Sequence, residues 1–159
     1  MNISKTLLVT LLSLTGFFFC TQTTKAQFDE RNIGVGLIVG EPTGISAKWW
    51  QNETVAYDAG VTWALSYDAE LHLHADYLRH NYDLLGKEIS KGKLPLYYGV
   101  GARLRLSDDP VLGARVPVGV NYLFKNEPIG IFIEAVPTLN LLPDVDFELN
   151  GGIGARYYF

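Results

Sequence analysis

The chain has 159 residues, of which 48% are hydrophobic, 13% aromatic and 19% charged. This composition describes one folded domain and excludes a disordered chain. The formal net charge is −4 and no run of Lys and Arg occurs, so a nucleic-acid partner is excluded as well.

Residues 1–26 have the parts of a secretory signal peptide. Lys5 supplies a positive start, an apolar core runs from Leu7 to Phe19, and a small residue, Ala26, precedes the expected cleavage site. The apolar run is too short for a membrane-spanning helix. Cleavage would leave residues 27–159, which contain no cysteine because Cys20 lies in the signal. We therefore expect an exported chain without disulfides, thiolate metal sites or a cysteine nucleophile.

Residues 27–159 alternate between apolar and polar or small residues with a period of two, which predicts β-strands with two different faces. In 128–142, for example, Ile129 and Ile131 share one face. Because a proline removes a ladder hydrogen bond, Pro95, Pro117 and Pro137 are expected near strand ends. The pattern predicts eight strands, at 32–40, 43–51, 54–66, 69–80, 94–106, 113–124, 128–142 and 146–159.

An eight-stranded meander can close as a soluble barrel or as a membrane barrel, which have opposite faces inward. The face with the charges is rich in glycine, and glycines that line a narrow barrel leave room for long charged side chains. The large apolar groups lie on the other face, where they would overfill a small interior. We therefore predict an all-β fold, an eight-stranded antiparallel up-and-down transmembrane β-barrel over residues 27–159. The inward glycines are Gly34, Gly36, Gly60, Gly99, Gly101, Gly119, Gly130, Gly152 and Gly154.

Outward-facing aromatic residues collect near one rim of the predicted barrel, the rim that holds both chain ends. Aromatic rings are enriched where a barrel crosses the membrane interface. The alternative explanation, that aromatic residues favour strands, predicts no bias toward one rim. The opposite rim has only Trp63 and Phe147. The predicted interface girdle comprises Trp49, Tyr57, Tyr77, Tyr98, Tyr122 and Phe124, with Tyr157 and Phe159 at the same level.

The last eight residues resemble the C-terminal assembly signal of bacterial outer-membrane proteins, with Gly154, Tyr157 and the terminal Phe159 in the matching places. With the signal peptide and eight strands, the chain resembles small OmpA/OmpX-like outer-membrane barrels, in an uncharacterised branch with stretches such as 40–48 and 71–77. The resemblance spans the mature chain and implies the bacterial outer membrane as its location. It implies outer-membrane lipid as surroundings, and the barrel-assembly machinery and periplasmic chaperones as partners during biogenesis.

The resemblance brings no established activity and no cofactor, and we expect a monomer. The predicted turns on the side away from the chain ends, at 41–42, 67–68, 107–112 and 143–145, are very short. Relatives often carry long external loops, so the short turns argue against an adhesin or receptor role.

Five basic and five acidic side chains are predicted to point into the barrel. Equal numbers suit a buried network of ion pairs, because unpaired charges in a narrow lumen are costly. We predict a salt-bridged plug that closes the barrel; the alternative is a narrow polar path for small solutes or ions. The predicted network comprises Lys48, Asp58, Glu70, Asp76, Arg103, Arg105, Arg115, Glu134, Glu148 and Arg156.

His72 and His74 share a strand face with Glu70 and Asp76, which makes the two histidines candidate metal ligands. We prefer the interpretation that both hydrogen-bond within the charge network, with no metal bound. Ser66 with His72 or His74 and Glu70 would suit a lipid-modifying enzyme, but no GxSxG motif occurs and we predict no catalytic residue. The remaining alternative is a soluble periplasmic lipocalin-like barrel, which would turn its apolar face inward around an apolar ligand.

Overall fold

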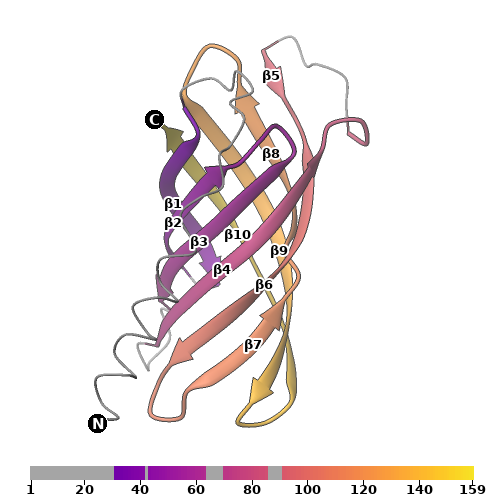
Figure 1. The fold of residues 1–159 in the computed structure, drawn as a ribbon. Coiled ribbons are helices and arrows are strands. Elements are labelled where there is room, and N and C mark those ends of the chain that lie inside the picture. The colour runs from indigo at the N-terminus through magenta and orange to yellow at the C-terminus, as the bar shows by residue number, and fades with distance from the viewer. Residues whose placement is uncertain (1–30, 42, 64–69, 86–90) are drawn as a thin grey trace, which may run out of the picture.

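The computed structural model describes residues 31–41, 43–63, 70–85 and 91–159, and its strands form a barrel (Figure 1). The predicted signal peptide, Ser66 and the predicted turn at 67–68 lie outside these residues. No helix among the described residues is long and apolar enough to cross a membrane. The strands are β1 (Ile33–Glu41), β2 (Thr43–Trp50), β3 (Val55–Trp63), β4 (Leu71–Asn81), β5 (Gly92–Lys93), β6 (Leu96–Leu106), β7 (Val111–Arg115), β8 (Val118–Phe124), β9 (Ile129–Leu142) and β10 (Asp146–Tyr158).

Every strand pairs antiparallel with its neighbours, and β10 pairs with β1 to close the ring. The segments β5 and β6 together form one interrupted strand of the barrel. The segments β7 and β8 form the next strand, since β6 pairs with both of them and β5 pairs with β8. The ten labelled segments therefore make eight barrel strands, and the predicted eight-stranded antiparallel barrel is confirmed. We call the end that holds Tyr158 the proximal end and the opposite end the distal end.

A proline lies at the interruption of each of these two barrel strands. Pro95 lies between β5 and β6, and Pro117 lies between β7 and β8, where its carbonyl oxygen accepts a hydrogen bond from Gly99 N at 2.9 Å. The expectation for Pro137 was wrong, because this residue lies well inside β9. Pro137 is tolerated there because the neighbouring barrel strand is already interrupted between β7 and β8. Its carbonyl oxygen accepts a hydrogen bond from Val116 N at 2.9 Å.

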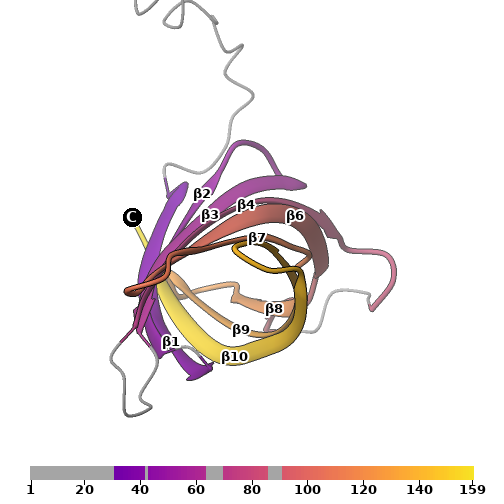
Figure 2. The same cartoon turned by 90° about the horizontal axis from the view of Figure 1, so that it is seen from below.

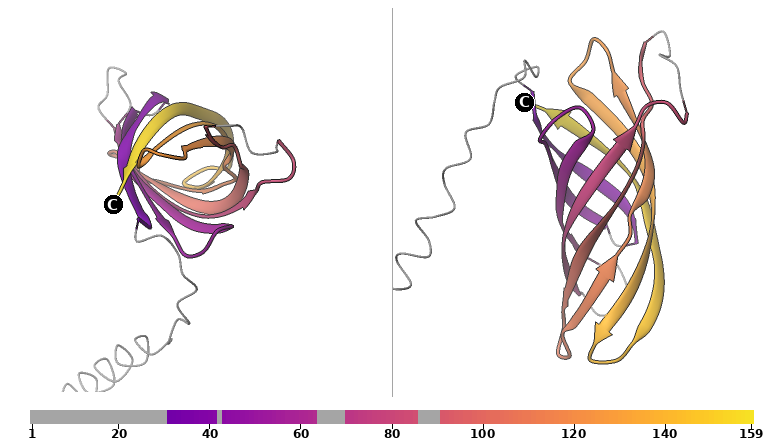
Figure 3. Two further views of the ribbon diagram at one scale, coloured as in Figure 1. Left: turned by 90° about the horizontal axis from the view of Figure 1, so that it is seen from above. Right: turned by 45° about the vertical axis from the view of Figure 1, so that its right-hand side comes forward.

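The strands are strongly staggered around the barrel. A row of paired residues on the outer face starts at Tyr157, passes once around the barrel and returns to β10 at Phe147, which is 157 − 147 = 10 residues from its start. A stagger of this kind requires strands that are tilted from the barrel axis, as Figures 1 and 3 show. The row consists of Tyr157, Val35, Ala47, Ala59, Ala75, Ala102, Ala114, Leu139 and Phe147.

Large apolar side chains point away from the barrel and charged side chains point into it. Along β1, for example, Val35, Leu37 and Val39 are exposed, whereas the intervening Ile38 is buried. Figure 2 shows the closed ring of strands from the distal end. Buried side chains such as Lys48, Tyr97 and Phe132 lie inside this ring. This orientation is the reverse of the one that the lipocalin-like alternative predicted.

Candidate functional site: the charged barrel interior

The most buried part of the interior is built around Asp58. On β3, Asp58 lies directly opposite Lys48 of β2, with Lys48 Nζ 3.9 Å from Asp58 Oδ2. Arg156 Nη2 approaches the same oxygen to 2.6 Å and also donates to Ser46 Oγ at 2.6 Å. The Ser46 hydroxyl in turn donates to Asp58 Oδ1 at 3.2 Å. One carboxylate therefore holds two cations whose side chains are almost completely buried.

Aromatic rings surround the same two cations. Lys48 Nζ lies 4.6 Å from the centre of the Tyr97 ring and 5.5 Å from that of Trp50, and it also contacts His80 Nε2 at 3.2 Å. The Arg156 guanidinium stacks on Phe132 at 3.8 Å. Desolvated cations gain from such contacts with ring faces, so the rings stabilise charges that water does not reach.

A second cluster lies beside the first. Arg115 Nε is 3.1 Å from Asp76 Oδ1, and Arg115 Nη2 is 3.8 Å from Glu134 Oε1. The Tyr97 hydroxyl donates a hydrogen bond to Glu134 Oε2 at 2.7 Å, which joins this cluster to the aromatic residues around Lys48. The carboxylates of β4 and β9 thus share one arginine from β7.

A third cluster lies toward the distal end and is more open to water. Arg103 Nη2 donates to Glu148 Oε2 at 2.9 Å and to Asn140 Oδ1 at 2.6 Å. Arg105 lies between two carboxylates, 3.4 Å from Glu148 and 3.5 Å from Glu70. The Glu148 side chain is 26% exposed, whereas that of Lys48 is 0% exposed, so solvent access increases from the centre of the barrel toward its distal end.

Beyond the third cluster, the distal end opens into a vestibule with a volume of about 690 Å³. Acidic residues of the β6–β7 and β9–β10 turns line it, together with Glu70, Glu148 and Arg105. We use the word vestibule for this cavity below. The turn residues concerned are Asp108, Asp109 and Asp144, and Asp146, the first residue of β10, lines the vestibule as well.

All ten residues of the predicted network point into the barrel, and each lies within 4.0 Å of an oppositely charged group. His72 and His74 also point inward, where they line a small cavity of about 20 Å³. The expected hydrogen bonds of His72 do not form within the described part of the chain: both ring nitrogens lack a partner, and Nε2 is 3.7 Å from Glu70 Oε2. Glu70 Oε2 lies between His72 and Arg105, 3.5 Å from Arg105 Nε, and is not within hydrogen-bonding distance of His72. The described residues contain no group of three or more His, Cys, Asp and Glu placed to hold a metal ion.

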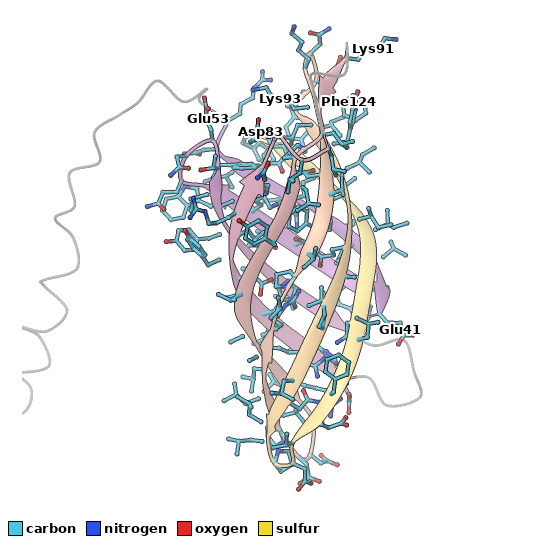
Figure 4. All side chains as sticks on the ribbon, turned by 90° about the vertical axis from the view of Figure 1, so that its right-hand side faces the viewer. Glu41, Glu53, Asp83, Lys91, Lys93 and Phe124 are labelled. Carbon is cyan, nitrogen blue, oxygen red and sulfur yellow. The ribbon has the colours of Figure 1, made fainter. Side chains whose placement is uncertain are left out.

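The predicted girdle residues lie on the outer wall near the proximal end, and Figure 4 shows Phe124 at this end with Lys91 and Lys93. Trp49 stacks on Tyr57 with 5.7 Å between ring centres, and Tyr57 contacts Tyr77 edge-on at 5.8 Å. Tyr98 and Phe124 are also exposed, whereas Tyr122 is half-buried and packs edge-on against Phe124 at 4.7 Å.

Comparisons with known proteins support the fold. No family model and no curated protein matches this sequence. The structure is similar to the N-terminal β-barrel domain of Pseudomonas aeruginosa OprF, with a TM-score of 0.59 and 14% identity over 81% of this chain and 98% of that domain. The chain has an OmpA-like outer-membrane barrel fold. The predicted resemblance to OmpA-like barrels is thereby confirmed for the fold.

In this OmpA-like barrel, Gly154 and Tyr157 of the predicted assembly signal lie on opposite faces of β10, Gly154 inward and Tyr157 outward. The Phe132 ring occupies the space that a Gly154 side chain would need, so a packing requirement adds to the predicted role of this glycine. Phe159 is exposed and contacts Tyr157 edge-on, with 5.0 Å between ring centres.

Sequence analysis missed the apolar part of the interior. Trp50, Ala56 and Tyr158 form a buried cluster at the proximal end, and Tyr97 and Phe132 belong to a second cluster with Ile38 and Leu78. A signal for them was present, because Trp50 has the inward parity of Lys48 and Tyr158 that of Arg156. The interior of the barrel therefore contains packed aromatic rings as well as ion pairs.

Proposed function

We propose that the protein is an integral outer-membrane β-barrel whose lumen is closed, and that its role is structural, with binding confined to its exposed surface. The observation that carries the proposal is the distribution of polarity across the wall. Outward residues such as Leu37 and Ile153 are 62% and 56% exposed, an arrangement suited to contact with lipid chains. The inward charges are arranged in ion pairs, as a lumen of low polarity requires.

The interior supports closure rather than conduction. Trp50 and Tyr158 pack together at the proximal end, and the clusters around Asp58 and Arg115 fill the middle. The small cavity beside His72 has a volume of about 20 Å³, which is enough for one water molecule and not for a continuous water column. These contacts favour the salt-bridged plug over the narrow polar path.

Fractionation of cells that express the full chain tests the membrane assignment. We expect a band in the outer-membrane fraction that is extracted by detergent and migrates differently before and after boiling, because a closed barrel resists detergent until it is heated. A soluble periplasmic band without such a shift would overturn the proposal.

Planar lipid bilayers test the closure. The wild-type protein is expected to give no steady conductance, whereas a Tyr97→Ala/Phe132→Ala variant removes two rings from the lumen and is expected to conduct. An Ile133→Ala variant, which changes the outer face, serves as the matched control and should behave as the wild type. Steady channels in the wild-type protein would instead support the polar path.

A further inference from the structure

The strand β10 extends past its neighbour β1 at the distal end. The pairing of β1 with β10 ends at Glu41 opposite Gly151, whereas the pairing of β9 with β10 continues to Asp146. Among the described residues, 146–150 therefore have β9 on one side and no strand on the other. Figures 1 and 3 show the β9–β10 hairpin reaching beyond the distal end of β1 and β2. We call residues 146–150 the β10 edge.

The hydrogen bonds at the proximal end show which backbone groups of this edge are free. Phe159 N donates to Ile33 O of β1, and Tyr158 N donates to Pro128 O on the β9 side. The direction alternates along an antiparallel strand, and the β9–β10 register is regular from Asp146 to Tyr157. Odd-numbered residues therefore point their N–H and C=O groups away from β9. At the β10 edge these residues are Phe147 and Leu149.

The side chains of the β10 edge have two different chemical faces. Phe147 and Leu149 point outward and are 64% and 68% exposed. Asp146 and Glu148 point inward and line the vestibule. Glu148 is already paired with Arg103 and Arg105, but the structure gives no cation within salt-bridge distance of Asp146 or Asp144 among the described residues. The edge thus combines free backbone groups, an apolar outer face and an acidic inner face.

We propose that the β10 edge binds an extended cationic segment of a partner protein, which adds to the barrel as one more antiparallel strand. In such additions, backbone hydrogen bonds supply affinity and alternate side chains supply specificity. Residues directly opposite each other point to the same face of a sheet. The partner therefore needs basic residues opposite Asp146 and Glu148, where they enter the acidic vestibule, and apolar residues opposite Phe147 and Leu149.

Charge complementarity decides between this occupant and a second copy of the chain. Two β10 edges that paired with each other would bring Asp144, Asp146 and Glu148 against the same acidic residues, and facing like charges are destabilising. A lipid offers no backbone to pair with the free N–H and C=O groups. The proposal goes beyond the closed membrane barrel and depends on its fold, but not on a closed lumen.

The test uses the folded protein in detergent micelles and an acetylated, amidated heptapeptide of alternating Lys and Val. The parent peptide is expected to bind, as measured by calorimetric titration. A peptide N-methylated at its valines keeps its charge but loses the donors that face Phe147 and Leu149, so we expect its affinity to fall at least tenfold. A peptide with Glu in place of Lys is expected not to bind. Failure of the parent to bind, or equal affinity of the N-methylated peptide, would overturn the proposal.

Variants of the protein locate the site. Leu149→Pro removes a free edge N–H without touching the β9–β10 ladder, a position where a proline is tolerated, and should reduce parent-peptide affinity at least tenfold. Leu149→Thr keeps the N–H and is the matched control, and the boiling shift verifies that both variants are folded. If Leu149→Pro misfolds, the difference in affinity between the parent and the N-methylated peptide for the wild-type protein still tests the proposal. Two further results would overturn the proposal that the occupant is a cationic segment of a partner protein. One is that the wild-type protein forms dimers that Leu149→Pro abolishes, and the other is that residues 64–69 of the same chain bind the β10 edge.

Discussion

Replacement of Asp58 by Asn is the sharpest test of the buried network. The substitution preserves the size of the side chain and removes only its charge. Lys48 and Arg156 then remain next to each other, with side chains 0% and 2% exposed and without the carboxylate that now lies 3.9 Å and 2.6 Å from them. Loss of a neutral hydrogen bond alone would cost about 1 kcal/mol. Removal of one member of a buried ion pair costs about 3–5 kcal/mol, so we expect the larger value.

The assay is equilibrium unfolding by urea in lipid vesicles, followed by tryptophan fluorescence in both directions. Glu70→Gln is the matched control, since the same chemical change occurs where the carboxylate is 29% exposed and its partner Arg105 is 25% exposed, so that water screens both charges. For that variant we expect a loss of about 1 kcal/mol. Adding Lys48→Met to Asp58→Asn removes one of the two cations that have lost their carboxylate partner. It should restore about half of the lost free energy of unfolding. Equal, small effects of Asp58→Asn and Glu70→Gln would refute the claim that the centre of the barrel holds a buried network.

Three further predictions follow from other contacts. Arg103→Met should lower the free energy of unfolding by about 3–5 kcal/mol, since Glu148 and Asn140 lose their common donor; an unchanged urea midpoint would contradict this. Phe132→Ala should cost about 3–5 kcal/mol in the same assay because its ring is buried against Arg156, and a loss below about 1 kcal/mol would show that the interior collapses around the gap. Burial, with a smaller effect of Glu53, raises the pKa of Tyr82 to about 12 from 10.0. The folded state then binds more protons than the unfolded state between these values, so stability falls as the pH rises from 10 toward 12, and Tyr82→Phe should make this fall shallower.

Residue parity predicted the two faces of the barrel because side chains alternate strictly along a strand. It placed Arg103, Arg115 and Arg156 inside without any knowledge of how the strands pair. It did not predict their partners, because Arg156 meets Asp58 across 98 residues of chain and Arg103 meets Glu148 across 45. Such contacts depend on closure and stagger, which follow from the pairing of β10 with β1.

The inward aromatic residues escaped prediction for a different reason. Size alternation was used to assign large groups to the outer face, and glycines were assigned to make room for charges. The structure shows that inward glycines also make room for rings, as Gly119 does for Tyr97 and Gly154 for Phe132. At these two positions the inward glycine makes room for a bulky neighbour, and the glycine itself does not say whether that neighbour is charged or aromatic.

Charge, packing and backbone pairing all change along the axis of the barrel, and together they locate where a partner can act. In the proximal half the rings are packed together and Asp58 is paired with Lys48 and Arg156, so a ligand that entered there would have to break buried contacts. At the distal end the vestibule is open, Asp144 and Asp146 are exposed, and Phe147 and Leu149 have no strand beside them, among the described residues, on the side away from β9. Short turns do not exclude recognition at this end, because a strand edge binds through its backbone and needs no long loop. The most deeply buried contacts and the proposed recognition site thus lie toward opposite ends of the same strands.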